Sequence, residues 1–256
     1  MTLAERNWRG DPARRALALH CSMGSSGYWG RIHDRLGGIV TLSAFDAPGH
    51  GRSPDWDPAS GDFHDAVTAA AAARIDGPVD LIGHSLGATV ALRLAVENPS
   101  RVRSLTLIEP VLFAAAGPEA ANAPIFSRMA ALLDEGRDEE ATRVFLALWG
   151  EGDFDALPEA TRARMVSQIR IVHALNGALT ADRAHILRPG GLESIAAPVM
   201  LIRGGDSPPV IEAIGDALAA RLGDVGRAVV PGAGHMLPIT HPEQVGDLVR
   251  VNLERV

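Results

Sequence analysis

PVDLIGHSLGATVALRLAVEN, residues 78–98, sets an apolar run beside a helical pattern with only a short turn between them. Residues 78–82 are typical of a short buried strand, and residues 88–98 place apolar side chains along one side of a helix. Residues 83–87, GHSLG, have the Gly-x-Ser-x-Gly spacing of a nucleophile elbow. A turn this sharp needs glycine two positions before and after the serine, because larger side chains would collide. It lifts the Ser85 hydroxyl above the sheet at a helix N-terminus, where free N–H groups favour negative charge.

The composition is that of a globular protein with one large α/β domain, or a core with a modest insertion. The 256 residues are 46% apolar and 21% charged, and the formal charge of −7 argues against nucleic acid as a partner. The single cysteine, Cys21, excludes an intramolecular disulfide and a cysteine-based metal cluster, and it favours a reducing compartment. Residues 1–11 lack the apolar core of a secretory signal, and no apolar run approaches the roughly 18 residues of a membrane helix. We therefore expect a cytoplasmic protein that does not bind membranes.

Strand and helix patterns alternate on both sides of the elbow. The predicted strands cover residues 15–20, 39–45, 78–82, 102–108, 199–203 and 227–230, and the predicted helices cover residues 31–36, 62–75, 88–98, 210–222 and 242–254. This alternation predicts a mostly parallel sheet with helices on both faces. The small-residue loop 21–29 leaves the end of a strand, where backbone N–H groups can face a substrate.

The alternation is interrupted once, after Glu109. Residues 112–195 show helical stretches broken by glycine and proline, and they predict a helical insertion that is too long for a loop. Its candidate helices cover residues 125–134, 138–149, 159–175 and 181–187. The predicted core then comprises residues 1–111 and 196–256.

Four motifs in order resemble those of the α/β-hydrolase superfamily, and the match covers nearly the whole chain: residues 20–29 (HCSMGSSGYW), residues 46–53 (DAPGHGRS), the elbow, and Gly234-His235. The resemblance implies an α/β-hydrolase fold in which the insertion is a cap over the site. There is room for one strand before Arg15 instead of two, so we expect the first strand of the family to be missing. Cys21 also replaces the glycine that usually follows the histidine of the first loop.

Hydrolase chemistry requires a base, because a serine hydroxyl is weakly nucleophilic alone. His235 lies where the family places its catalytic histidine, so we expect it to be the base for Ser85. His84 is expected to point away from the nucleophile and to be structural, while His20 and His50 are expected in loops or in a pocket wall. No pair of histidines has metal-ligand spacing, and we predict neither a metal nor a cofactor.

Two acids fit the family order of serine, acid and histidine. Glu109 ends the strand after the elbow, where some family members carry the acid. Asp206 follows the penultimate strand, where most members carry it, but counting from Gly204 the usual position is Ser207. We place Glu109 first and keep Asp206 as the alternative. The resemblance also implies an oxyanion hole formed by the backbone N–H groups of Ser22 and Leu86.

The predicted function is that of a serine hydrolase acting through an acyl-enzyme on a small, largely uncharged substrate, most simply a carboxylic ester. Carbon–carbon hydrolases, lyases and acyltransferases on the same fold are alternatives, as is a ligand-binding protein without catalysis. A serine at the elbow argues against haloalkane dehalogenases and epoxide hydrolases, whose nucleophile is an aspartate. The apolar side chains of the insertion are expected mainly to pack helix against helix, with a pocket lining as the alternative: Phe126, Met129, Phe145, Leu148, Trp149, Met165, Ile169 and Leu175. His173 and His185 are candidates for polar pocket contacts or for solvent exposure.

Overall fold

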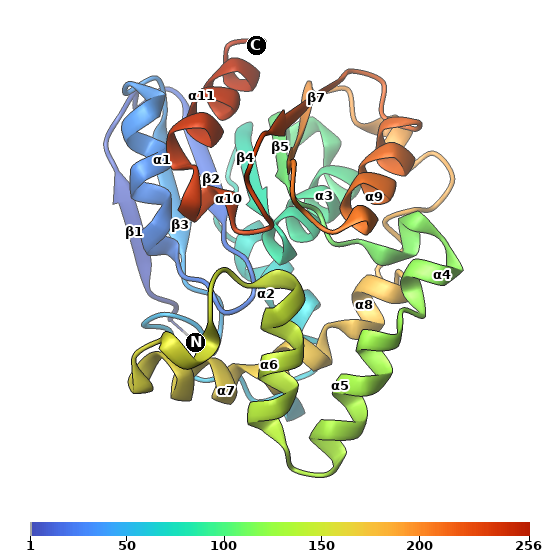
Figure 1. Ribbon diagram of the computed structural model, residues 1–256. Coiled ribbons are helices and arrows are strands. Elements are labelled where there is room, and N and C mark those ends of the chain that lie inside the picture. Colours follow the sequence, from blue (N-terminus) through green and yellow to red (C-terminus); the bar gives the residue numbers. More distant parts are fainter. Residues whose placement is uncertain (1) are drawn as a thin grey trace.

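Seven strands form one central sheet in the computed structural model, which describes residues 2–256 (Figure 1). The strands are β1 (Glu5–Trp8), β2 (Arg15–Leu19), β3 (Thr41–Phe45), β4 (Val79–His84), β5 (Val102–Ile108), β6 (Val199–Gly204) and β7 (Val225–Val230). Their order is β1-β3-β2-β4-β5-β6-β7, with β1 antiparallel to β3 and every other pair parallel. This is the mostly parallel sheet that the sequence predicts.

Strand β4 lies at the centre of the sheet, and all six of its residues are buried. It is covered on both faces, since Leu81 packs into one apolar cluster and the next residue, Ile82, into the other. A strand buried on both faces reads as a continuous apolar run, which explains why residues 78–82 lack alternation. The elbow follows the carboxyl end of this strand.

One strand, β1, precedes Arg15, as expected from the room that the sequence leaves there. Strand β1 has no buried residue, and its polar sequence, ERNW, shows no alternation that would have revealed it. It is placed by ladder pairing with β3, in which Glu5 lies opposite Phe45.

Helices cover both faces of the sheet. The core helices are α1 (Trp29–Leu36), α2 (Phe63–Ala72), α3 (Leu86–Glu97), α9 (Pro209–Ala219), α10 (Leu237–Thr240) and α11 (Pro242–Leu253). The apolar sides of α1 and α11 share one cluster, while α2, α3 and α9 pack into the cluster on the opposite face. Within residues 2–256, no helix is both long and apolar enough to cross a membrane.

The helical insertion, residues 112–195, lies between β5 and β6 in the chain and gathers below the sheet in Figure 1. Its helices are α4 (Pro118–Ala121), α5 (Pro124–Asp134), α6 (Asp138–Trp149), α7 (Glu159–Ala174) and α8 (Asn176–Thr180). Helices α5, α6 and α7 form a small apolar cluster of their own through Met129, Leu133, Ala141, Ile169 and Val172. The insertion is tied to the core where Gln168 Nε2 donates to the Gly49 carbonyl oxygen at 2.8 Å.

The helix predicted over residues 181–187 is wrong. Asp182 and His185 have left-handed backbone, with φ of 45° and 51°, which an α-helix does not permit. The Asp182 carboxylate accepts hydrogen bonds from the N–H groups of Ile186 and Leu187, at 2.9 and 2.8 Å. A local side-chain acceptor therefore replaces the helical ladder in this segment.

Candidate active site

The elbow places Ser85 between the end of β4 and the start of α3. Its backbone is strained, with φ 56° and ψ −116°, and its N–H donates to the Ile108 carbonyl oxygen at 2.9 Å. A Cβ on Gly83 would lie 2.3 Å from the Gly87 carbonyl oxygen, and one on Gly87 would lie 2.1 Å from that of Leu19. Neither position has space for a side chain, because the helix and two strands meet around the turn.

His235 and Glu109 continue from Ser85 in a line of hydrogen bonds. His235 Nε2 lies 3.0 Å from Ser85 Oγ, and His235 Nδ1 lies 2.8 Å from Glu109 Oε2. The three residues come from the ends of β4, β5 and the loop after β7, and all three are buried. The sheet therefore brings together residues that are far apart in the sequence.

The Glu109 carboxylate is fully buried, and hydrogen bonds account for both of its oxygens. Oε1 accepts from the Gly204 N–H at 2.7 Å and from the Ser207 hydroxyl at 2.8 Å. The backbone of Glu109 has φ 51°, a left-handed conformation that aims its side chain across the ends of the strands. These donors hold the carboxylate in place beneath His235.

Asp206 lies on the surface, where its backbone N–H donates to the Ala233 carbonyl oxygen at 2.9 Å. The structure thus brings Glu109, and not Asp206, against His235. Ser207, the position at which the resemblance places the usual acid, donates its hydroxyl to the Glu109 carboxylate.

The hydrogen bonds define where the protons lie. A carboxylate can only accept, so His235 Nδ1 carries a proton and donates it to Glu109. The lone pair of Nε2 then accepts from the Ser85 hydroxyl. This arrangement can remove a proton from Ser85 while the buried carboxylate stabilises the imidazolium that forms.

The two residues predicted to form the oxyanion hole are both close to Ser85, one along the chain and one across the cavities. Leu86 is the first residue of α3, directly after the serine, and Ser22 lines the same cavities as Ser85 and His235. The loop that carries Ser22 is held by His20, whose Nδ1 donates to the Cys21 carbonyl oxygen while Nε2 accepts from the Ala47 N–H. Burial raises the pKa of the Cys21 thiol to about 12, so the thiol stays protonated.

Two cavities meet at Ser85 and His235. The larger has a volume of about 200 Å³ and extends under α6 and α10, and the smaller, of about 40 Å³, extends between α5, α7 and α8. Apolar side chains form most of both walls. Among the described residues that line them, Glu151 is the only carboxylate and there is no arginine.

Most of the apolar side chains predicted to pack within the insertion also line these cavities: Phe126, Met129, Phe145, Trp149, Met165 and Leu175. Ile169 is buried in the cluster of the insertion, and Leu148 is exposed. The expectation that packing would be their main role is therefore too narrow. Among the described residues, neither His173 nor His185 lines either of these two cavities, and His185 is exposed.

Two contacts were not predicted from the sequence. The Trp149 ring packs edge-on against the imidazole of His235, with ring centroids 4.8 Å apart, so the insertion contacts this histidine directly. Asn176 places an amide in the wall of the smaller cavity, where the other lining residues of the insertion are apolar. A tryptophan at the end of a predicted helix gives no sequence signal that it contacts a histidine 86 positions away.

Known proteins resemble this chain in both sequence and fold. The model of the alpha/beta hydrolase family matches residues 16–248. The chain is 30% identical to a pimeloyl-[acyl-carrier protein] methyl ester esterase of Neisseria meningitidis, over 98% of this chain and 80% of that protein. It is also 30% identical to the lipase LipV of Mycobacterium tuberculosis, over 94% of both chains. Among solved structures, a hydrolase from Pseudomonas aeruginosa superimposes with a TM-score of 0.72 at 25% identity, over 98% of this chain and 94% of the other.

The family model spans most of the chain, and two relatives at 30% identity, an esterase and a lipase, match nearly its whole length. The chain therefore belongs to the alpha/beta hydrolase family and is an enzyme of the ester-hydrolase type.

Proposed function

We propose that this enzyme is a serine hydrolase that cleaves small, largely uncharged carboxylic esters through an acyl-enzyme. The observation that carries the proposal is the line of hydrogen bonds from Ser85 through His235 to the buried Glu109, at the point where two apolar cavities meet. We assign Ser85 as the nucleophile, His235 as the base and Glu109 as the acid, and Asp206 has no part in the reaction.

The assigned groups account for both halves of the reaction. Ser85 Oγ attacks the ester carbonyl while His235 Nε2 takes its proton, and the N–H groups of Ser22 and Leu86 stabilise the resulting oxyanion. His235 then donates the proton to the leaving alcohol, which leaves an acyl group on Ser85. Water attacks this acyl group with His235 again as the base, and Ser85 is regenerated with release of the acid.

The cavity walls support the uncharged character of the substrate. The chain has no lysine, and no arginine lines either cavity among the described residues. A carboxylate buried there would lose its hydration without gaining a cation, which is strongly unfavourable. We therefore propose that the helical insertion acts as a cap that selects neutral, mainly apolar groups on both sides of the ester.

The test is hydrolysis of p-nitrophenyl esters from acetate to octanoate by the wild type and by Ser85→Ala. We expect turnover by the wild type and a loss of about 10⁵-fold or more in the variant. Ser127→Ala is the matched control, because Ser127 is an exposed serine on α5 away from both cavities, and it should retain full activity. Turnover that persists in Ser85→Ala would overturn the assignment of the nucleophile.

A further inference from the structure

His84, the residue before Ser85, is fully buried and makes two hydrogen bonds that the proposed reaction does not use. Its Nε2 lies 2.9 Å from the backbone carbonyl oxygen of His235, and its Nδ1 lies 3.1 Å from the Tyr28 hydroxyl. A carbonyl oxygen only accepts, so Nε2 carries the proton and Nδ1 is left as an acceptor for Tyr28. His84 therefore holds the loop that carries His235 through the backbone of that loop.

Tyr28 extends this series of hydrogen bonds to the loop that follows β2. With its proton donated to His84, its oxygen accepts from the Cys21 N–H at 3.2 Å. Cys21 directly precedes Ser22, one of the two oxyanion donors assigned above. Along this line of hydrogen bonds, the Cys21 N–H donates to Tyr28, the Tyr28 hydroxyl donates to His84, and His84 donates to the His235 carbonyl oxygen.

Burial also keeps the imidazole in the required state. Desolvation, with a smaller effect from the nearby His235, holds the pKa of His84 well below its usual value, so the ring is neutral. A neutral ring offers one donor and one acceptor, which is what the two bonds require.

We propose that Tyr28 and His84 are positioning residues that fix the oxyanion loop and the His235 loop relative to the Ser85 elbow. The inference rests on the proposed function, since it takes Ser22, Ser85 and His235 as the reacting groups. Three loops far apart in sequence are joined by these three hydrogen bonds, and neither Tyr28 nor His84 is among the described residues that line the two cavities. Misplacement of a reacting group by about 1 Å can lower a rate on the order of 10²-fold. Loss of these hydrogen bonds would therefore lower kcat and leave substrate binding largely unchanged.

The test uses Tyr28→Phe, His84→Gln and the double variant on one p-nitrophenyl ester. Tyr28→Phe removes a single oxygen and keeps the ring, while the glutamine amide can still donate to the His235 carbonyl oxygen but cannot also bond Tyr28. We expect each single variant to lower kcat by about 10- to 100-fold, with KM changed by less than about threefold. The double variant should be about as slow as the slower single variant, because both break the same chain.

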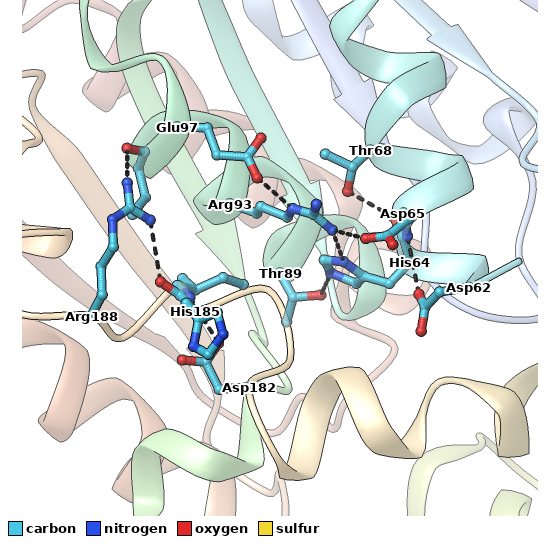
Figure 2. Close-up of polar contacts among 12 residues, drawn as sticks. Asp62, His64, Asp65, Thr68, Thr89, Arg93, Glu97, Asp182, His185 and Arg188 are labelled. Carbon is cyan, nitrogen blue, oxygen red and sulfur yellow. Dashed lines mark hydrogen bonds and ion pairs between the residues drawn. The ribbon is translucent and has the colours of Figure 1, made fainter.

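Thr68→Val is the matched control, since the buried Thr68 hydroxyl donates to the His64 carbonyl oxygen on α2, outside the site (Figure 2). It removes one buried hydroxyl and should leave kcat within about twofold of the wild type, while losing a similar amount of stability. An unchanged kcat in Tyr28→Phe, a rise in KM alone, or losses that multiply in the double variant would overturn the proposal. If His84→Gln does not fold, the split between kcat and KM in Tyr28→Phe still decides.

A second measurement separates this inference from the proposed function. If the wild type cleaves no ester, histidine ¹⁵N and backbone amide NMR of the wild type and Tyr28→Phe still test the chain. We expect His84 as the neutral Nε2–H tautomer, and shifts in the amide signals of both Ser22 and His235 when the Tyr28 hydroxyl is removed. A different tautomer, or signals that do not move, would contradict the positioning role whatever the reaction is.

Discussion

At the scale of single residues, the site depends on two backbone conformations that side chains rarely adopt. Ser85 and Glu109 both have positive φ, 56° and 51°, and each follows the end of a central parallel strand. Such conformations cost on the order of 1–3 kcal/mol each, and the surrounding sheet maintains them. Their positions at neighbouring strand ends allow His235 to bridge the serine and the carboxylate.

The assignment of Glu109 gives a direct comparison of two carboxylates. In Glu109→Gln the amide has the size of the carboxylate but no longer stabilises an imidazolium or the Nδ1–H tautomer, so kcat should fall by about 10³- to 10⁴-fold. Asp206→Asn is the control at the other candidate, and its kcat should change by less than about threefold, because Asp206 lies on the surface. A large loss in Asp206→Asn with little effect in Glu109→Gln would reverse the assignment. Steady-state kinetics on one ester decides between them.

At the scale of elements, a polar cluster joins helix α2 to helix α3, the helix that follows the elbow (Figure 2). His64 on α2 contacts the Thr89 hydroxyl through Nε2, at 3.2 Å, and Arg93 Nη1 through Nδ1, at 3.3 Å. Burial, and then the positive charge of Arg93, lower the pKa of His64 to about 4. The histidine is therefore neutral in the folded protein at pH values where it is charged in the unfolded chain.

This difference predicts an acid-sensitive interface. As pH falls from about 6.5 to about 4, the unfolded state takes up a proton on His64 that the folded state does not, so the free energy of unfolding falls by about 1.4 kcal/mol per pH unit from this group. His64→Gln removes the titration, and its stability should fall less steeply in that window. His185→Asn is the control, because His185 is exposed in the same region (Figure 2) and asparagine suits its left-handed backbone. Denaturant unfolding at a series of pH values would contradict this if wild type and His64→Gln gave parallel curves.

Sequence patterns located elements and motifs well where local chemistry decides them. Helices α5, α6 and α7 begin and end within one residue of their predicted bounds, since their boundaries are local signals. The helix predicted over residues 181–187 was wrong because the Asp182 carboxylate accepts hydrogen bonds from two backbone N–H groups. The pairing of Glu109 with Ser207, and of Tyr28 with His84, joins residues 98 and 56 positions apart, and no local pattern encodes such contacts.

At the scale of the whole molecule, the sheet presents the site and the helical insertion closes it. Ser85, His235 and Glu109 come from the core, while the α5–α8 segment, which includes Phe145 and Trp149, supplies most of the apolar walls. Hydrogen bonds tie the insertion to the core, among them those from Gln168 to the Gly49 carbonyl oxygen and from Arg188 to the Val96 carbonyl oxygen. We infer that reactivity is encoded in the core and substrate size in the insertion.

The smaller cavity gives a prediction about size. Phe126 lines it and packs edge-on against Phe113, with ring centroids 5.0 Å apart. Phe126→Ala should enlarge this cavity and raise kcat/KM for octanoate relative to acetate, by about tenfold, which corresponds to one or two accommodated methylenes. Val229→Ala, at an exposed valine outside both cavities, is the control and should leave the ratio unchanged. An unchanged ratio in Phe126→Ala would mean that this cavity does not hold the acyl chain.

The central claim is that Ser85 carries the acyl group, and the most direct measurement is the mass of the peptide that contains it. The enzyme is mixed with p-nitrophenyl butyrate, quenched in acid within milliseconds to seconds, digested and examined by mass spectrometry. We predict a butyryl mass increase on Ser85, formed together with a burst of p-nitrophenol and absent from Ser85→Ala. Turnover by the wild type with an unmodified Ser85 peptide at every quench time, or an acyl group on another residue such as Cys21, would contradict the account.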